Sequence, residues 1–209
     1  TVNLKNCDIS KNTSRSVAGG IYAGQLTTLN MNETTVAENT AKTYGGGLYT
    51  YGQDDEKGNS RVNLTNCKIT GNTANYGGGI YMARNQKPEK RDQNHYHDFY
   101  VANTTPTQTL NITGGTVANN TALANGGGIC TDKDDRDTSY STLIVKVADG
   151  TVENNRAQLG QDVYAYKTKA DTVLHLPQAS KIHDNGRWLN ENTSETLKDE
   201  PIDYDPIQR

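Results

Sequence analysis

The stretch NYGGGIY at residues 75–81 is the clearest copy of a phrase that occurs five times in the 209 residues. A glycine cluster before an aliphatic residue is also typical of phosphate-binding loops, but a protein needs such a loop once. Five copies therefore indicate a repeated architecture. The other copies are VAGGIY at 17–22, TYGGGLY at 43–49, ANGGGIC at 124–130 and QLGQDVY at 158–164.

A second phrase precedes each glycine cluster and completes the repeat. From the start of this phrase to the end of the cluster, each of the five copies spans 20 or 21 residues, which predicts a structural unit, or rung, of constant size. A sixth copy lacks the glycine cluster. The phrases are VNLKNCDISKNT from residue 2, LNMNETTVAENT from 29, VNLTNCKITGNT from 62, LNITGGTVANNT from 110, VKVADGTVENNR from 145 and LHLPQASKIHDNG from 174.

Hydrophobic and polar residues alternate inside each repeat, as strands with one buried face require. We expect three short strands per rung, and because one rung cannot bury its aliphatic side chains alone, the rungs must stack. The expected columns are Val2, Leu29, Val62, Leu110 and Val145; Leu4, Met31, Leu64, Ile112 and Val147; Ile9, Val36, Ile69, Val117 and Val152; and Ile21, Leu48, Ile80, Ile129 and Val163.

Rungs stacked at about 4.8 Å pair in parallel with their neighbours. The predicted fold class is all-β: a right-handed single-stranded parallel β-helix, a solenoid of about six rungs, since crossovers between parallel strands are right-handed. Consecutive glycines and β-branched residues exclude an α-helical repeat. The predicted domains are the β-helix at 1–186 and a C-terminal cap and polar tail at 187–209, in which Trp188 and Leu189 cover the exposed strand edges of the last rung.

One asparagine recurs three residues beyond the inward Ile or Val of each rung, where the chain turns a corner. Asparagine tolerates left-handed backbone, and its amide can hydrogen-bond to its copy one rung away, so we expect a stacked amide ladder. Glycosylation at motifs such as Asn32-Glu33-Thr34 is the alternative. The expected ladder residues are Asn12, Asn39, Asn72, Asn120, Asn155 and Asn185.

The three cysteines have no metal-binding or disulfide spacing. Cys7 and Cys67 have inward parity and are expected to be buried about two rungs apart, beyond disulfide reach. Cys130 stands where other rungs carry an outward tyrosine, so it is the expected exposed thiol.

The phrase GGGIY following I-x-x-N-T, repeated over about residues 1–186, resembles the right-handed β-helix repeats of bacterial surface adhesins and of autotransporter-like polymorphic membrane proteins. The resemblance implies a secreted or surface-displayed bacterial protein. It implies no single activity, because pectate-lyase-like lyases, glycoside hydrolases, phage tailspikes and adhesins share this coil.

Charge and hydropathy exclude other classes. The formal net charge of −3 offers no basic surface to nucleic acid. No apolar run reaches the roughly 18 residues of a membrane helix, and residues 1–20 do not have the pattern of a signal peptide. We therefore expect the chain to be an excerpt that continues into further rungs or domains upstream.

Function is expected in the links that follow the glycine strands, because the rungs differ most there. The links at 50–61, 82–109 and 131–141 leave the column at one corner and are expected to form one contact surface. Adhesion or glycan binding is the leading prediction, since aromatic rings stack on sugars while polar groups bind the hydroxyls. The outward tyrosines extend this surface or simply stabilise the sheet. The candidate ligand-binding residues are His95, Tyr96, His97, Tyr100, Tyr49 and Tyr81.

An enzyme is the alternative. A glycoside hydrolase needs two carboxyl groups about 5–9 Å apart, and a glycoside hydrolase or polysaccharide lyase would take them from neighbouring links. The candidate catalytic residues are Asp98, Asp54, Asp55, Asp132 and Asp135. A passive stalk that displays other domains is the third hypothesis.

No cofactor and no metal site are predicted, with one open alternative. The run DKDDRD offers hard oxygen ligands to calcium, although it lacks the glycine and final glutamate of an EF-hand loop. His95, His97 and Asp98 are a weaker transition-metal candidate, since an H-x-H pair in a polar loop is usually free. The calcium ligands would be Asp132, Asp134, Asp135 and Asp137.

Overall fold

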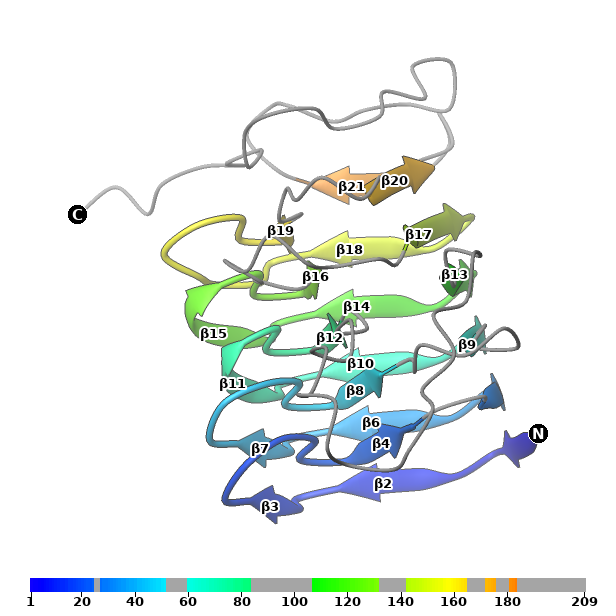
Figure 1. The fold of residues 1–209 in the computed structure, drawn as a ribbon, viewed down its shortest axis with the longest axis horizontal. Helices are drawn as coiled ribbons and strands as arrows, with labels where there is room; N and C mark the ends of the chain where they lie inside the picture. The colour runs from blue at the N-terminus through cyan, green and yellow to red at the C-terminus, as the bar shows by residue number, and fades with distance from the viewer. Residues whose placement is uncertain are drawn as a thin grey trace, which may run out of the picture.

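The computed structural model in Figure 1 stacks strands one above another in a column. The structure describes residues 1–24, 27–51, 60–83, 107–131, 142–164, 172–175 and 181–183. Within these ranges the chain forms strands and turns and contains no helix. The chain passes through four sheets, here called A to D, and then returns to sheet A beside the strand it made there before. This all-β arrangement is compatible with a parallel β-helix.

Sheets A and B each contain six parallel strands, one from every rung. They form because the alternating phrase pairs with its own copy in the next rung. Sheet A consists of β1 (Val2–Lys5), β5 (Thr28–Asn32), β9 (Ser60–Thr65), β13 (Thr107–Thr113), β17 (Thr142–Ala148) and β20 (Thr172–His175). Sheet B consists of β2 (Asp8–Ser10), β6 (Thr35–Ala37), β10 (Lys68–Thr70), β14 (Thr116–Ala118), β18 (Thr151–Glu153) and β21 (Lys181–His183).

Sheet C is a strand position that the sequence did not predict, so the first four rungs have four strands instead of three. Its strands begin at the threonine after each corner asparagine, and the shortest contain only two residues, too few to show alternation. Sheet C consists of β3 (Thr13–Ser14), β7 (Thr40–Ala41), β11 (Thr73–Tyr76) and β15 (Thr121–Asn125). Sheet D consists of β4 (Ile21–Ala23), β8 (Leu48–Tyr51), β12 (Ile80–Ala83), β16 (Ile129–Thr131) and β19 (Val163–Tyr164).

The four predicted aliphatic columns are confirmed residue by residue. In sheet B, for example, Ile9 pairs with Val36, and Ile69 pairs with both Val36 and Val117. The sixth phrase continues two columns with Leu174 beside Val145 and Ile182 beside Val152. The inward side chains of sheets A, B and D form one buried hydrophobic cluster. Short aliphatic residues are sufficient because each is covered by its copies in the neighbouring rungs.

The glycine cluster is explained by close approach between rungs. A Cβ added at Gly46 would lie 2.6 Å from the carbonyl oxygen of Thr73 in the next rung and closer still to that of Gly78. A Cβ at Gly47 would lie 3.0 Å from Nδ2 of Asn72. Any side chain here would push the rungs apart, so packing between rungs is sufficient to require these glycines.

Candidate functional site

Buried asparagines line one corner of the column and hold successive rungs in register. In Asn72 the backbone N–H and Nδ2 both donate to Oδ1 of Asn120, at 3.0 and 2.9 Å, and Nδ2 also donates to the carbonyl of Val36 at 3.0 Å. Its own Oδ1 accepts the N–H and Nδ2 of Asn39. The predicted ladder is confirmed for Asn12, Asn39, Asn72, Asn120 and Asn155, while Asn185 lies outside the described residues.

The left-handed backbone predicted for these asparagines belongs instead to the residue before each of them. This residue makes the turn, and the asparagine after it points its amide into the corner. The φ angles of the turn residues are 61° for Lys11, 56° for Glu38, 66° for Gly71, 56° for Asn119 and 56° for Asn154.

The described ladder ends on a carboxylate. Oδ1 of Asp162 accepts the backbone N–H of Asn155 at 3.1 Å and its Nδ2 at 2.6 Å. Asp162 is 2% exposed and aligns with the last glycine of the cluster in the rung below, Gly128. In lower rungs that glycine leaves room for the next asparagine, so the Asp162 side chain takes the place of a ladder amide.

A second row of asparagines runs along the outer face of sheet A and was not predicted. Nδ2 of Asn30 donates to Oδ1 of Asn3 at 2.8 Å, and Asn63 and Asn111 continue the row at 2.7 Å each. This row could have been predicted from the sequence, because each of these asparagines is the second residue of its repeated phrase. We call this the face row and the buried set the corner ladder.

The outward tyrosines of sheet D form a packed cluster, which includes two of the candidate ligand-binding residues. The rings of Tyr49 and Tyr81 stack with centroids 5.8 Å apart, and Tyr44 lies 4.6 Å from Tyr81. Tyr81 is 2% exposed and Tyr49 half-buried, whereas Tyr22 at the N-terminal end is 56% exposed. A ligand role for Tyr49 and Tyr81 stays a prediction, and the contacts that the structure describes for them are packing contacts.

Cys130 is not the exposed thiol that its outward parity predicted. Its side chain is fully buried and packs in the tyrosine cluster, because it stands between Tyr81 and Tyr164, which are themselves each 2% exposed. Cys67 is buried as predicted, and burial raises the pKa of its thiol. Cys7, in the first rung, is only half-buried.

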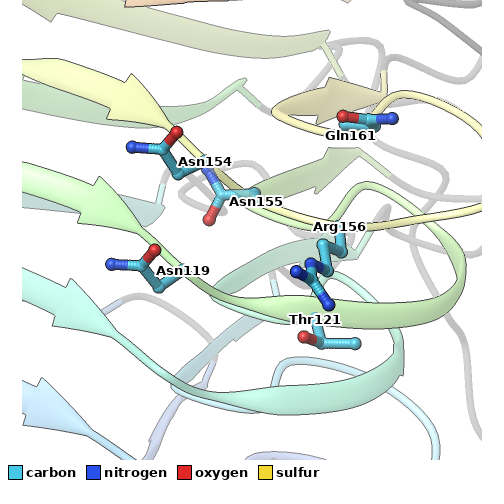
Figure 2. A pocket seen from close by; sticks show the side chains of 6 residues that line it. All are labelled: Asn119, Thr121, Asn154, Asn155, Arg156 and Gln161. Atoms are coloured by element: carbon cyan, nitrogen blue, oxygen red, sulfur yellow. The ribbon is translucent and has the colours of Figure 1, made fainter.

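A polar hollow of about 900 Å³ opens at the corner that follows sheet B in the fourth and fifth rungs. Figure 2 shows Asn119 and Asn154 one above the other at the turn, with Arg156 above Thr121 and Gln161 at the upper rim. The backbone is fixed here, since the N–H of Arg156 donates to Asn120 and the N–H of Ala122 donates to Arg156. The described lining residues are Asn119, Thr121, Asn154, Asn155, Arg156 and Gln161.

The hollow lies where the fifth rung differs in sequence from the four rungs below it. Arg156 pairs with Thr121, in a row that is threonine in every lower rung. Gln161 stands where the rung below has Gly127, as the alignment of Val163 with Ile129 shows. Sequence reasoning missed these residues because it looked for function only in the long links, although the departures are visible in the aligned repeats.

The chemistry of the hollow suits binding. The Arg156 guanidinium is exposed and presents planar N–H donors, the pattern that fits a carboxylate or sulfate. The amides of Asn119, Asn154 and Gln161 donate and accept, which suits sugar hydroxyls. The amide of Asn155 is committed to Asp162. None of the described lining residues is a carboxylate, so these residues by themselves do not supply the acid pair of a glycosidase.

Most of the predicted site residues lie outside the described ranges: His95, Tyr96, His97, Asp98, Tyr100, Asp54, Asp55, Asp132, Asp134, Asp135 and Asp137. The contact surface, the catalytic alternative and the calcium alternative therefore stay predictions. In the parts that are described, no group of three His, Cys, Asp or Glu side chains is placed to hold a metal ion. No described helix is long and apolar enough to cross a membrane.

Comparison with known proteins identifies no relative: no family model matches the sequence, and no curated protein or solved structure matches it significantly.

Proposed function

We propose that this chain is a glycan-binding module of a secreted or surface-displayed bacterial adhesin, built on a right-handed single-stranded parallel β-helix. The rigid column carries the binding groups, and the links at 50–61, 82–109 and 131–141 extend the contact surface. The bacterial surface location follows from the resemblance of the repeats to those of surface adhesins.

The observation that supports this proposal is the polar hollow around Arg156. Residues that repeat in every rung serve the column, so the side chains that break the repeat are the ones available for another task. Here these are the Arg156 guanidinium and the Gln161 amide. They lie together with the exposed amides of Asn119 and Asn154 and with the hydroxyl of the repeated Thr121. This set favours a sugar that carries a carboxylate or sulfate, because a planar guanidinium binds such groups in bidentate fashion.

Glycan-array binding of the chain, followed by calorimetry on the best ligand, tests the proposal. The informative variant is Arg156→Thr, which restores the residue of the lower rungs and should leave the fold intact. We expect it to weaken binding of an acidic glycan at least about tenfold, as loss of a charge-assisted hydrogen bond requires.

Arg61→Thr is the matched control. Arg61 is also exposed, and it lies in sheet A between Thr28 and Thr109, so this change likewise restores the local repeat. It should leave glycan affinity unchanged. Equal affinities for the two variants would refute the role of the hollow, and Tyr96→Ala and Tyr100→Ala would then test the longest link by itself.

A further inference from the structure

Leu123 in β15 is an exposed apolar side chain beside the polar hollow. Three large hydrophobic residues are exposed in the described ranges, and of these Val2 and Tyr22 belong to the first rung, whereas Leu123, at 63% exposed, lies within the column. Exposure alone carries little meaning, since single apolar residues are common on protein surfaces. The strand that holds Leu123, however, is irregular at this position.

A β-bulge in the fourth rung contains Leu123. β15 has one residue more than β11 between two aligned pairs, so Leu123 and Ala124 stand opposite the single residue Asn75. The fifth rung is also one residue shorter here, as its two bridges to β15 show. The second rung has the extra residue too, but its exposed side chain there is the polar Lys42. Bulges re-aim side chains and are frequent next to active sites, so an apolar side chain in this one is a candidate for a binding role.

Leu123 shares the outer face of the column with two polar groups of the fifth rung. Thr121 and Leu123 lie two residues apart on one strand, with an inward residue between them, so both side chains point outward. Thr121 pairs with Arg156, which places the backbones of Leu123 and Arg156 about 8 Å apart, as strand rise and rung spacing require. Gln158, two residues beyond Arg156, is exposed, and its N–H donates to the carbonyl of Ala124. A guanidinium, an amide and an apolar side chain are therefore neighbours on one face.

These three groups match the substituents of one class of sugar. The Arg156 guanidinium binds a carboxylate, the Gln158 amide can pair with the amide of an acyl group, and Leu123 offers apolar contact to a methyl group. An acidic sugar with an N-acyl substituent carries a carboxylate, an amide and a methyl group on one ring. We propose that the hollow prefers such N-acylated acidic sugars and that Leu123 determines this preference. The inference rests on the proposed glycan binding at Arg156 and narrows it to one ligand class.

Two pairs of sugars, each differing only in the acyl amide, test the preference by calorimetry with the whole chain. One pair is the methyl glycoside of N-acetylneuraminic acid and its analogue with a hydroxyl in place of the acetamido group. The other is the methyl glycosides of 2-acetamido-2-deoxyglucuronic acid and of glucuronic acid. In the pair that binds, we expect the N-acetyl sugar to bind at least about fourfold more tightly, the ratio that burial of one methyl group gives.

Leu123→Asn gives the fourth rung the residue of the third and should lower this ratio below about twofold, because the apolar contact is lost. Affinity for the hydroxyl analogue should not change. Deletion of Leu123 gives the turn the length that it has in the third and fifth rungs, and it should lower the ratio in the same way. Lys42→Asn, at the same position two rungs lower, is the control and should leave the ratio unchanged.

The outcomes separate this inference from the proposed function. Failure of all four sugars to bind would refute acidic-glycan binding at the hollow, and this inference with it. Binding that Arg156→Thr weakens, but that is equal within each pair, would leave the proposed function in place and overturn the preference for N-acyl groups. A preference that persists in both Leu123 variants would overturn the role of Leu123.

Discussion

The corner ladder and the face row both stack asparagine on asparagine in successive rungs, yet their amides have different environments. Asn72 is fully buried and takes part in five hydrogen bonds through its backbone N–H, Nδ2 and Oδ1. Asn63, in the face row, is half-buried and makes one side-chain bond to each neighbour. Burial removes water as an alternative partner, so an amide that is optional at the surface becomes necessary in the corner.

The two rows also run in opposite directions. In the corner ladder each amide donates toward the C-terminal end of the column, and in the face row each donates toward the N-terminal end. The face row meets Lys146 in the fifth rung, which aligns with Asn111, whereas the corner ladder continues to a buried acceptor, Asp162. Among the described residues, only the buried row thus ends on a hydrogen-bonding partner, Asp162, as its lack of water requires.

Asn72→Ala should have the largest effect on stability. It leaves the N–H and Nδ2 of Asn39 and the carbonyl of Val36 without their buried partner, and we expect the free energy of unfolding to fall by about 3–5 kcal/mol. Urea denaturation followed by circular dichroism measures it. A loss below about 1 kcal/mol would show that water replaces the missing amide and that the two rows are equivalent.

Gly47→Ala tests the packing of the glycine cluster against the corner ladder. The added Cβ would lie 2.8 Å from the carbonyl oxygen of Gly79 and 3.0 Å from Nδ2 of Asn72. We expect a loss of about 2–3 kcal/mol by the same denaturation, because backbone of the next rung must move. Gly71→Ala is the control: its φ of +66° is strained for alanine, but the added Cβ would make only ordinary van der Waals contacts, 3.6 Å from Cγ of Glu38, so it should cost only about 1 kcal/mol.

Asn63→Ala should change the free energy of unfolding by no more than about 0.5 kcal/mol, since water can solvate the amides of Asn30 and Asn111. Denaturation curves of this variant and of Asn72→Ala, recorded side by side, give the contrast between the two rows. A loss comparable to that of Asn72→Ala would mean that the face row stabilises the sheet as strongly as the corner does.

Cys67, which is buried, and Cys7, which is half-buried, extend the comparison to thiols. Burial raises the pKa of Cys67, so folding favours its neutral form. The stability that this provides is complete below the thiol pKa of the unfolded chain and is lost as pH rises through the folded value. In native protein at pH 8, a thiol reagent should label Cys7 rapidly and Cys67 only on unfolding. Rapid labelling of both would show that the column opens readily.

Most of the fold was predictable because each rung repeats one set of spacings. The repeated phrase around Ile69 and the glycine cluster around Ile80 predicted which residues pair. The structure then explained the glycines by the close packing of successive rungs. The strands of sheet C were missed because two residues such as Thr13 and Ser14 carry no periodicity.

The candidate site was less predictable. The alternation of residues shows on which side of a strand Cys130 and Tyr81 lie, but not what covers that side. Their burial in the outer cluster could therefore be seen only in the structure. To predict the hollow from the sequence, Arg156 and Gln161 would have to be compared with the same positions in the lower rungs, which hold threonine and glycine. Residues that differ from the repeat become visible as a candidate site only when the repeats are aligned and each difference is considered for a functional role.

Successive asparagines of the corner ladder are separated by 27, 33, 48 and 35 residues, yet each pair makes the same hydrogen bonds. Chain length between rungs and geometry between rungs are therefore independent. The extra closure entropy of the longest interval over the shortest is only about 0.5 kcal/mol. Segments between sheets D and A can accordingly be exchanged, lengthened or grafted at little thermodynamic cost, so the column tolerates wide variation in the length of these links.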